Sequence, residues 1–237
     1  MHPRAAGSMV VEAGTPSSTT ENHSFVVGRS PSMRAIERVA SEIAATDIPV
    51  LIVGDSCTGK EVVAMRIHQL SERRDQGMLT INCAALTLAS LQEHLDGAKN
   101  GEAQGAVGRG TLFLDEISEL DLACQPRLLH ALPDGNGPRH GPSLGARLIC
   151  STSRNLEEEM RAGRFREELY FRINGVCLRL PPLRHRKEDI RPLVEHFLDK
   201  QAGLLGRPRP ALSAGTLGLL QDYSWPGNVR ELENVVK

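Results

Sequence analysis

The sequence lacks a large net charge, a recognisable leader segment and any apolar run long enough to cross a membrane. Its 237 residues include 28 Lys and Arg against 29 Asp and Glu, which gives a formal net charge of −1. No overall field therefore draws the chain to nucleic acid or to an anionic membrane, and such binding would be local or would come from another chain. The apolar runs are far too short for a bilayer, and no basic start leads into an apolar stretch. We expect a soluble, cytoplasmic protein without membrane contact.

Several signatures of metal and hydrolase chemistry are also missing. The five cysteines are odd in number, widely spaced and include no C-x-x-C pair, which argues against a disulfide framework or a zinc site. The eight histidines show no H-x-x-x-H spacing, and no serine stands in a nucleophile elbow. Metalloenzyme and serine hydrolase functions therefore have little support, and the cysteines are best interpreted as buried thiols.

The hydrophobic pattern divides the chain into three parts. Residues 1–23 are rich in small and polar residues, so they cannot offset the entropy of ordering and are predicted to be a disordered tail. Residues 24–183 begin with a helical pattern, for which Ser30 is placed as a cap and Pro31 at the first helical position. Short continuous apolar runs then alternate with helix-compatible stretches, which predicts a parallel sheet of α/β type. The runs are PVLIVG, MLTINC, TLFLDEI, ARLICST and GVCLRLP.

The last part, residues 184–237, shows helical spacing and no strand signal. It predicts a small all-helical unit after the α/β unit. Asn228 with Glu231 indicates a variant of the capping box, because the glutamate side chain can reach back to the amide of the cap residue.

A phosphate-binding loop is predicted directly after the first apolar run. The segment GDSCTGKE has the form G-x-x-x-x-G-K between a strand and a helix, so several backbone amides and a helix N-terminus turn toward one point. Lys60 would reach the terminal phosphates of a nucleotide. In isolation the segment could be a glycine-rich turn with a solvated lysine, but its context favours the phosphate site. The candidate binding residues are Gly54, Asp55, Ser56, Cys57, Thr58, Gly59, Lys60 and Glu61.

Two carboxylates follow the buried run TLFL. Asp115, at the end of the predicted strand, can hold a magnesium ion through water, and Glu116 can polarise the water that attacks a γ-phosphate. Two acids at a strand end could instead be solvated or cap a helix. Together with the loop they form a Walker A and Walker B pair, which predicts ATP and Mg²⁺ as the ligands.

From FVVGRS to WPGNVRELENVV, the sequence resembles the AAA+ domain of bacterial enhancer-binding proteins, the ATP-driven activators of sigma-54 RNA polymerase. The resemblance implies an AAA+ P-loop NTPase fold, with a parallel sheet followed by a helical lid subdomain. In that family the loop usually reads G-E-S-G-T-G-K-E, so Glu61 is a family trait, whereas Cys57 replaces a glycine. A side chain at that position would crowd the phosphates, or would strain the turn if its φ is positive.

The resemblance implies roles for four residues outside the two motifs. Asn82 in INCAAL matches an asparagine that hydrogen-bonds the Walker B glutamate and switches it with nucleotide state. Thr152 falls at the sensor I position, where the family's A-T-N reads Ser-Thr-Ser, so nucleotide sensing by that strand would be weaker. Arg230 in WPGNVREL matches sensor II over the nucleotide, and Val27 in FVVGRS is a candidate nucleotide contact.

The segment GRFREELYFRIN resembles the one that supplies two arginine fingers. Arg166 and Arg172 are therefore candidates for reaching the γ-phosphate of a neighbouring subunit. Surface salt bridges with Glu167, Glu168 or nearby acids are the alternative, but the paired spacing favours the finger interpretation. The finger interpretation implies a ring-type homo-oligomer, a hexamer or heptamer.

The resemblance fails in two loops. The family carries a G-A-F-T-G-A motif that contacts sigma-54, but this chain has only the twelve residues AKNGEAQGAVGR between Gly97 and Gly110. The segment LPDGNGPRHGPSLGARL is also shorter and richer in Gly and Pro than its family counterpart. We therefore expect that the chain does not engage sigma-54 in the usual way, and that RNA polymerase or another transcription component is its partner. No helix-turn-helix or receiver segment is recognisable, so DNA binding is expected only through a domain outside this chain.

Two functional hypotheses remain. The first is an oligomerising ATPase module of a transcription regulator, with Glu116 as the residue that orients water. The second is a non-catalytic module in which nucleotide sets assembly or partner binding, and it is favoured by Cys57, by Ser153 and by the missing loop.

Overall fold

The computed structural model describes residues 26, 28–100, 110–132 and 145–237, and the side chains of residues 96–100 are not part of that description. The predicted tail, Val27 and most of the two loops in which the family resemblance fails lie outside the described residues. Among the described helices, none is long and apolar enough to span a membrane.

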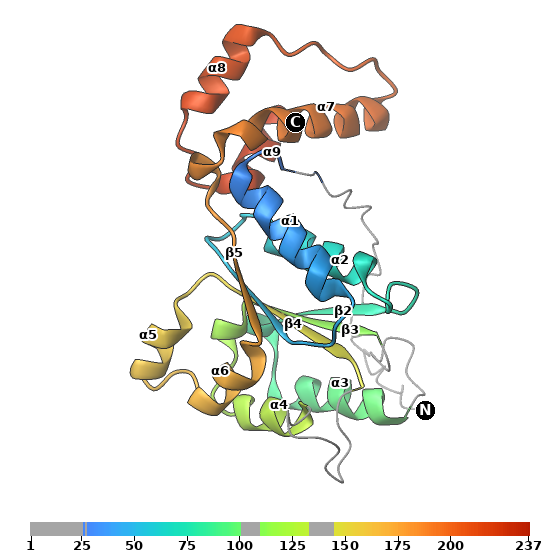
Figure 1. Cartoon of the computed structure of the whole chain (residues 1–237), viewed down its shortest axis with the longest axis vertical. Helices are drawn as coiled ribbons and strands as arrows, with labels where there is room; N and C mark the ends of the chain where they lie inside the picture. The colour runs from blue at the N-terminus through green and yellow to red at the C-terminus, as the bar shows by residue number, and fades with distance from the viewer. Residues whose placement is uncertain (1–25, 27, 101–109, 133–144) are drawn as a thin grey trace, which may run out of the picture.

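A parallel sheet forms the centre of the described structure (Figure 1). Its strands are β1 (Val50–Val53), β2 (Met78–Asn82), β3 (Thr111–Asp115), β4 (Arg147–Thr152) and β5 (Val176–Arg179), in the order β2-β3-β4-β1-β5. Every neighbouring pair is parallel. Each of the five predicted runs therefore forms a strand, and the α/β prediction is confirmed.

Burial differs between the central and the edge strands. All six residues of β4 are buried, because this strand is covered on both faces, whereas β2 and β5 at the edges keep exposed residues. The burial on both faces that a continuous apolar run predicts is therefore found in the central strand β4 and not in the edge strands.

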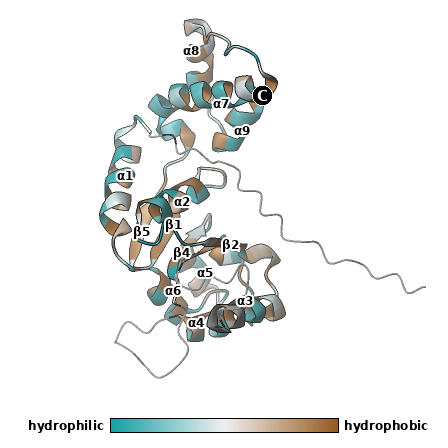
Figure 2. Cartoon of the chain, turned by 90° about the vertical axis from the view of Figure 1, so that its right-hand side faces the viewer, coloured by the Kyte–Doolittle hydropathy of each residue, from teal (hydrophilic) through white to brown (hydrophobic). Residues whose placement is uncertain are grey.

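Helices cover both faces of the sheet, as the side view in Figure 2 shows. On one face lie α1 (Pro31–Ala44) and α2 (Lys60–Leu70), and on the other lie α3 (Leu88–Asn100), α4 (Gln125–Ala131), α5 (Leu156–Arg161) and α6 (Glu167–Ile173). Short 3-10 helices η1 (Cys83–Ala85) and η2 (Ile117–Glu119) follow β2 and β3. The predicted start of α1 is confirmed, since the Ser30 hydroxyl accepts a hydrogen bond from the Met33 amide and Pro31 is the first helical residue.

A separate helical unit follows the sheet and lies at one end of the molecule (Figure 1). It consists of η3 (Leu183–His185), η4 (Lys187–Asp189), α7 (Ile190–Leu205), α8 (Ala214–Asp222) and α9 (Asn228–Val236). Its own apolar core includes Phe197, Trp225 and Leu232. The prediction of an all-helical unit is confirmed, and we refer to residues 183–237 as the lid.

The start of α9 differs from the predicted capping box. Glu231 reaches back as expected, but its Oε2 accepts from the amide of Gly227, at 2.8 Å, because Gly227 and not Asn228 precedes the helix. Asn228 has a φ of 51°, and its side chain leaves the helix. Its Oδ1 accepts from the Leu183 amide and its Nδ2 donates to the Ser56 carbonyl, each at 2.9 Å. The prediction that Asn228 caps α9 was therefore wrong.

Candidate nucleotide-binding site

The predicted phosphate loop lies at the carboxyl end of β1 and leads into α2. Two of its positions require glycine. A Cβ on Gly54 would lie 2.8 Å from the Leu180 carbonyl oxygen, and Gly59 has a φ of 98°, in the left-handed region. The Gly54 amide donates to the Thr152 carbonyl at 3.2 Å, which ties the loop to the end of β4.

Cys57 adopts a backbone conformation with positive φ, for which strain is expected from the sequence. Its φ is 62°, which is uncommon for a residue with a Cβ and costs roughly 1–2 kcal/mol. The thiol is half-buried. The cysteine therefore sits where glycine would be unstrained, and the surrounding contacts must hold it there.

Lys60 is not a solvated lysine, since only 5% of its surface is exposed. Its Nζ donates to the carbonyls of Gly54 and Asp55, at 3.0 and 3.4 Å, and lies 2.9 Å from Oε1 of Glu116. The fold thus brings the lysine of the loop and the second acid of the TLFLDE segment together. The interpretation of the loop as a turn with a solvated lysine is excluded.

The two predicted acids are held at the end of β3 by a serine of β4. The Ser151 hydroxyl donates to Oδ1 of Asp115 and accepts from the Glu116 amide at 3.1 Å. Glu116 has a φ of 53°, so the chain turns sharply directly after the strand. This turn directs the Glu116 side chain back toward Lys60.

The Glu116 carboxylate is bound on both oxygens. Oε2 accepts from the amide and the hydroxyl of Ser153, each at 2.8 Å, while Oε1 meets Lys60. Burial alone would raise the pKa of this carboxyl, but the hydrogen bonds from Lys60 and Ser153 hold the pKa below its ordinary value. Glu116 is therefore ionised near neutral pH.

The contact between Ser153 and Glu116 is not predicted by the sequence, in which Ser153 is only a departure from the family motif. Its contact with Glu116 follows from the parallel pairing of β3 and β4, which places the residues just after the two strands side by side. Only the pairing of these two strands could have indicated the contact between Ser153 and Glu116.

Asn82 and Thr152 reach the same edge of the sheet but use their side chains locally. Asn82 is the strand partner of Asp115, and its Oδ1 accepts from the Ala84 amide at 2.9 Å. No hydrogen bond joins it to Glu116 within the described structure, so the predicted switch stays a prediction. Thr152 is buried, and its hydroxyl pairs with the backbone of Arg154.

The lid donates hydrogen bonds to backbone carbonyls of the phosphate loop. Val229 donates its amide to the Cys57 carbonyl at 3.0 Å, next to the contact of Asn228 with Ser56. Arg186 donates to the Thr58 carbonyl at 2.6 Å. Arg230 is exposed on α9 and makes no hydrogen bond or ion pair with other described residues. The roles of Asn228 and Arg186 were not foreseen, because these contacts join residues more than a hundred positions apart.

The two candidate arginine fingers are not part of this cluster. Arg166 precedes α6, is exposed, and has its Nε 3.8 Å from Oε2 of Glu168. Arg172, within α6, donates to the Leu132 carbonyl at 3.2 Å. Figure 1 shows α6 beyond the sheet from α1 and α2, on the side away from the lid.

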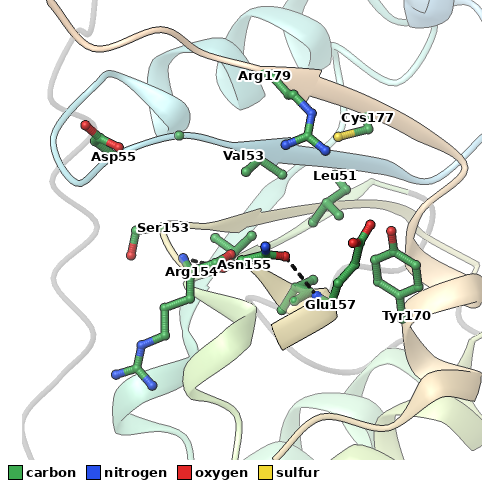
Figure 3. Close-up of a pocket in the computed structure, with 13 residues that line it drawn as sticks. Leu51, Val53, Asp55, Ser153, Arg154, Asn155, Glu157, Tyr170, Cys177 and Arg179 are labelled. Carbon is green, nitrogen blue, oxygen red and sulfur yellow. Dashed lines mark hydrogen bonds between the residues drawn. The ribbon is translucent and has the colours of Figure 1, made fainter. Parts of the chain in front are cut away.

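A recess of about 220 Å³ adjoins the loop on the α5–α6 side of the sheet. Figure 3 shows Cys177 and Arg179 of β5, Tyr170 of α6 and the start of α5 around it, where Asn155 caps the Glu157 amide at 3.1 Å. The volume is below the roughly 300–1,000 Å³ that is typical of small-molecule pockets. The recess by itself is therefore smaller than a typical enclosed ligand pocket.

Comparison with known proteins identifies the family. Residues 26–179 match the sigma-54 interaction domain, and residues 184–237 match the AAA+ ATPase lid domain. The chain belongs to the sigma-54 interaction domain family. The AAA+ fold that the sequence resemblance implied is thereby confirmed, including the helical lid after the sheet.

Regulators of transcription are among the relatives of this sigma-54 interaction domain. The transcriptional regulatory protein ZraR of Klebsiella oxytoca is 42% identical over 90% of this chain and 51% of its own length. The Nif-specific regulatory protein of Klebsiella pneumoniae is 43% identical over 90% of this chain and 43% of its own length. The structure of NtrX from Brucella abortus in complex with ATP superimposes with a TM-score of 0.76 at 32% identity, over 90% of this chain and 51% of that one. The chain thus spans about half the length of these relatives.

Proposed function

We propose that this domain binds and hydrolyses ATP as the motor module of a bacterial transcription regulator. The observation that carries the proposal is the meeting of Lys60 and Glu116, 2.9 Å apart, beside the glycine loop. Hydrolysis requires a cation that binds the phosphates and a carboxylate that orients water, and in this proposal Lys60 and Glu116 supply these two groups.

The loop amides, Lys60 and Glu116 have different roles in the proposed reaction. Backbone amides of residues 55–60 and the N-terminus of α2 bind the phosphates, since the Gly54 amide is already bound to the Thr152 carbonyl. Lys60 exchanges its loop carbonyls and Glu116 for the terminal phosphates, which releases the Glu116 carboxylate. Glu116 then accepts a proton from the water that attacks the γ-phosphorus, as the bond to the β–γ bridging oxygen breaks and ADP and phosphate form.

A magnesium ion fits the acid that precedes Glu116. Asp115 is a half-buried carboxylate at a strand end, with one oxygen fixed by Ser151. In the part of the chain that the structure describes, no group of three or more His, Cys, Asp or Glu side chains could hold a metal by itself. Asp115 would therefore hold Mg²⁺ through water, together with the phosphates of the nucleotide, as is usual for this ion. Bound there, the ion neutralises charge that develops on the phosphate oxygens.

The complete site includes a second copy of the chain. Arg166 and Arg172 lie beyond the sheet from α2, so in this proposal they reach the γ-phosphate of a neighbour in a hexameric or heptameric ring. An arginine supplied in this way stabilises the charge of the transition state. The exposure of Arg166 supports the arrangement.

The name of the relative ZraR, a transcriptional regulatory protein, supports a place in transcription. In this proposal the domain acts in the cytoplasm, and RNA polymerase or another transcription component is its partner. DNA binding would come from a part outside this chain. Because AKNGEAQGAVGR carries no G-A-F-T-G-A motif, we expect no stable complex with sigma-54 in the presence of ADP and aluminium fluoride. A complex seen by size exclusion would reject that part of the proposal.

A phosphate-release assay on the wild type and on Glu116→Gln tests hydrolysis. The proposal expects steady release by the wild type and almost none by the variant, with nucleotide affinity kept in both. The second candidate, a non-catalytic module that responds to nucleotide, is favoured by the binding of both Glu116 oxygens and by the strained Cys57. Nucleotide binding without release by the wild type would establish that candidate instead.

A further inference from the structure

The lid donates hydrogen bonds to three consecutive carbonyl groups of the phosphate loop. The bonds run from Asn228 Nδ2 to Ser56 at 2.9 Å, from Val229 N to Cys57 at 3.0 Å, and from Arg186 Nη2 to Thr58 at 2.6 Å. In a trans peptide the carbonyl and the following amide point in opposite directions. Carbonyls that face the lid therefore turn the following amides away from the lid and into the loop, where the Thr58 amide donates to the Asp55 carbonyl at 3.4 Å and phosphates would bind.

The two side chains that make these bonds are deeply buried. Asn228 is 2% exposed and Arg186 is 4% exposed. Asn228 joins three segments, because its Oδ1 also accepts from Leu183 at the start of the lid. A buried donor that loses its acceptor is costly, so the lid and the loop constrain each other strongly.

The loop needs this support at Cys57. A residue with a Cβ in the left-handed region persists only where its surroundings determine its conformation. The Cys57 carbonyl and the carbonyls on both sides of it are the three that the lid binds. Glycine at this position would hold the same φ without help.

We propose that Asn228 is a positioning residue, which together with Arg186 holds the phosphate loop around Cys57 in its anion-binding shape, so that nucleotide affinity depends on the lid through these bonds. This proposal rests on the nucleotide binding proposed above. Asn228 acts through the loop backbone, and its contribution is larger with cysteine at position 57 than with glycine.

Asn228→Asp is the sharpest test. The aspartate keeps an oxygen for the Leu183 amide but presents a second oxygen, and no donor, to the Ser56 carbonyl. We expect a fluorescent ATP analogue to bind about tenfold more weakly. Asn234→Asp makes the same change at an exposed position of the same helix, and it should leave the affinity unchanged.

Cys57→Gly completes a double-mutant cycle. Because glycine keeps a positive φ without the lid, Asn228→Asp should weaken binding by no more than about threefold in the Cys57→Gly background. An equal loss in both backgrounds would overturn the proposed link between Cys57 and the lid. Unchanged affinity in Asn228→Asp alone would overturn the proposal as a whole.

Two further measurements separate this proposal from nucleotide binding and from misfolding. Hydrogen exchange of the loop amides, measured without nucleotide, should be faster in Asn228→Asp than in Asn234→Asp. If the wild type failed to bind the ATP analogue, the proposed function would fall, and equal exchange rates in these two variants would separately overturn the present inference. Trp225, the single tryptophan, lies in the lid core and reports by its emission whether the lid is folded.

If Asn228→Asp unfolds the lid, Arg186→Gln replaces it in the exchange and binding measurements. It removes the guanidinium that donates to the Thr58 carbonyl while leaving Asn228 intact, and faster exchange with weaker binding is again expected. Wild-type exchange and affinity in a folded Arg186→Gln would contradict the proposal.

Discussion

The phosphate loop and helix α6 both carry basic residues of the proposed site, but they are built in opposite ways. Lys60 is 5% exposed and bound by loop carbonyls and Glu116. Directly before α6, Arg166 is exposed, and within α6 Phe171 is 69% exposed. The buried lysine already bonds groups of its own chain, whereas the exposed Arg166 side chain lies where, in our proposal, a group from a neighbouring copy would reach it. The comparison predicts different consequences for variants in the two regions.

Lys60→Ala should have the largest effect on binding. It removes the side-chain cation that, in our proposal, binds the phosphates, and it leaves Glu116 without its cationic partner. We expect a loss of ATP-analogue affinity of at least about a hundredfold, measured by fluorescence titration. Lys187→Ala, at an exposed lysine of the lid, serves as the control. Wild-type affinity in Lys60→Ala would contradict the assignment of the loop.

Arg166→Ala and Arg172→Ala should instead affect hydrolysis and not binding. A finger supplied in trans contributes about 10³–10⁵ in rate, so loss of the finger should make phosphate release nearly undetectable. Affinity for the ATP analogue should stay within about twofold, because the phosphates are held by the other chain. Arg161→Ala, at an exposed arginine of α5, is the control. A parallel loss of affinity would place these arginines within the binding site of their own chain.

Ser153→Ala should have an intermediate effect. It removes the hydroxyl bond to Oε2 of Glu116 but keeps the amide bond, so the carboxylate is held less firmly. We expect hydrolysis to fall about threefold to tenfold with unchanged affinity. Ser41→Ala, on the exposed side of α1, should behave as the wild type. Faster hydrolysis in Ser153→Ala would mean that Ser153 restrains Glu116 and does not position it.

The smallest effect concerns the buried His68, whose Nδ1 lies 2.8 Å from the Thr111 hydroxyl. Burial lowers its pKa, so the unfolded chain takes up the proton more readily than the folded one. The contribution of His68 to the free energy of unfolding should therefore be at its maximum above about pH 6.5, and the free energy of unfolding should fall as the pH decreases from there. Urea unfolding between about pH 7.5 and 5.5 should show less of this decline in His68→Asn than in the exposed His185→Asn. An equal decline in both would contradict the effect.

The sequence predicted those parts of the molecule that depend on neighbours along the chain. The strands follow from continuous apolar runs, and the start of α1 follows from Ser30 and Pro31. The loop, Asp115 and Glu116 were recognised because each motif is contiguous. For Cys57 the sequence predicted strain only if φ is positive, and the sign of φ depends on what surrounds the loop.

The contacts that complete the site depend on how distant segments pack. Ser153 reaches Glu116 because β3 and β4 are parallel neighbours. Asn228 reaches Ser56 because the lid folds back over the loop, and no pattern within WPGNVREL indicates that its asparagine leaves its own helix. Local capping rules therefore gave the wrong role for this residue.

The most direct test of a site shared between two copies is a mixing experiment. Glu116→Gln and Arg172→Ala should each be inactive alone, the first for lack of the water-orienting carboxylate and the second for lack of the finger. When the two are mixed, some interfaces pair an intact Glu116 with an intact Arg172, so phosphate release should recover in part. No recovery, at concentrations where mixed assemblies are shown to form, would contradict the account.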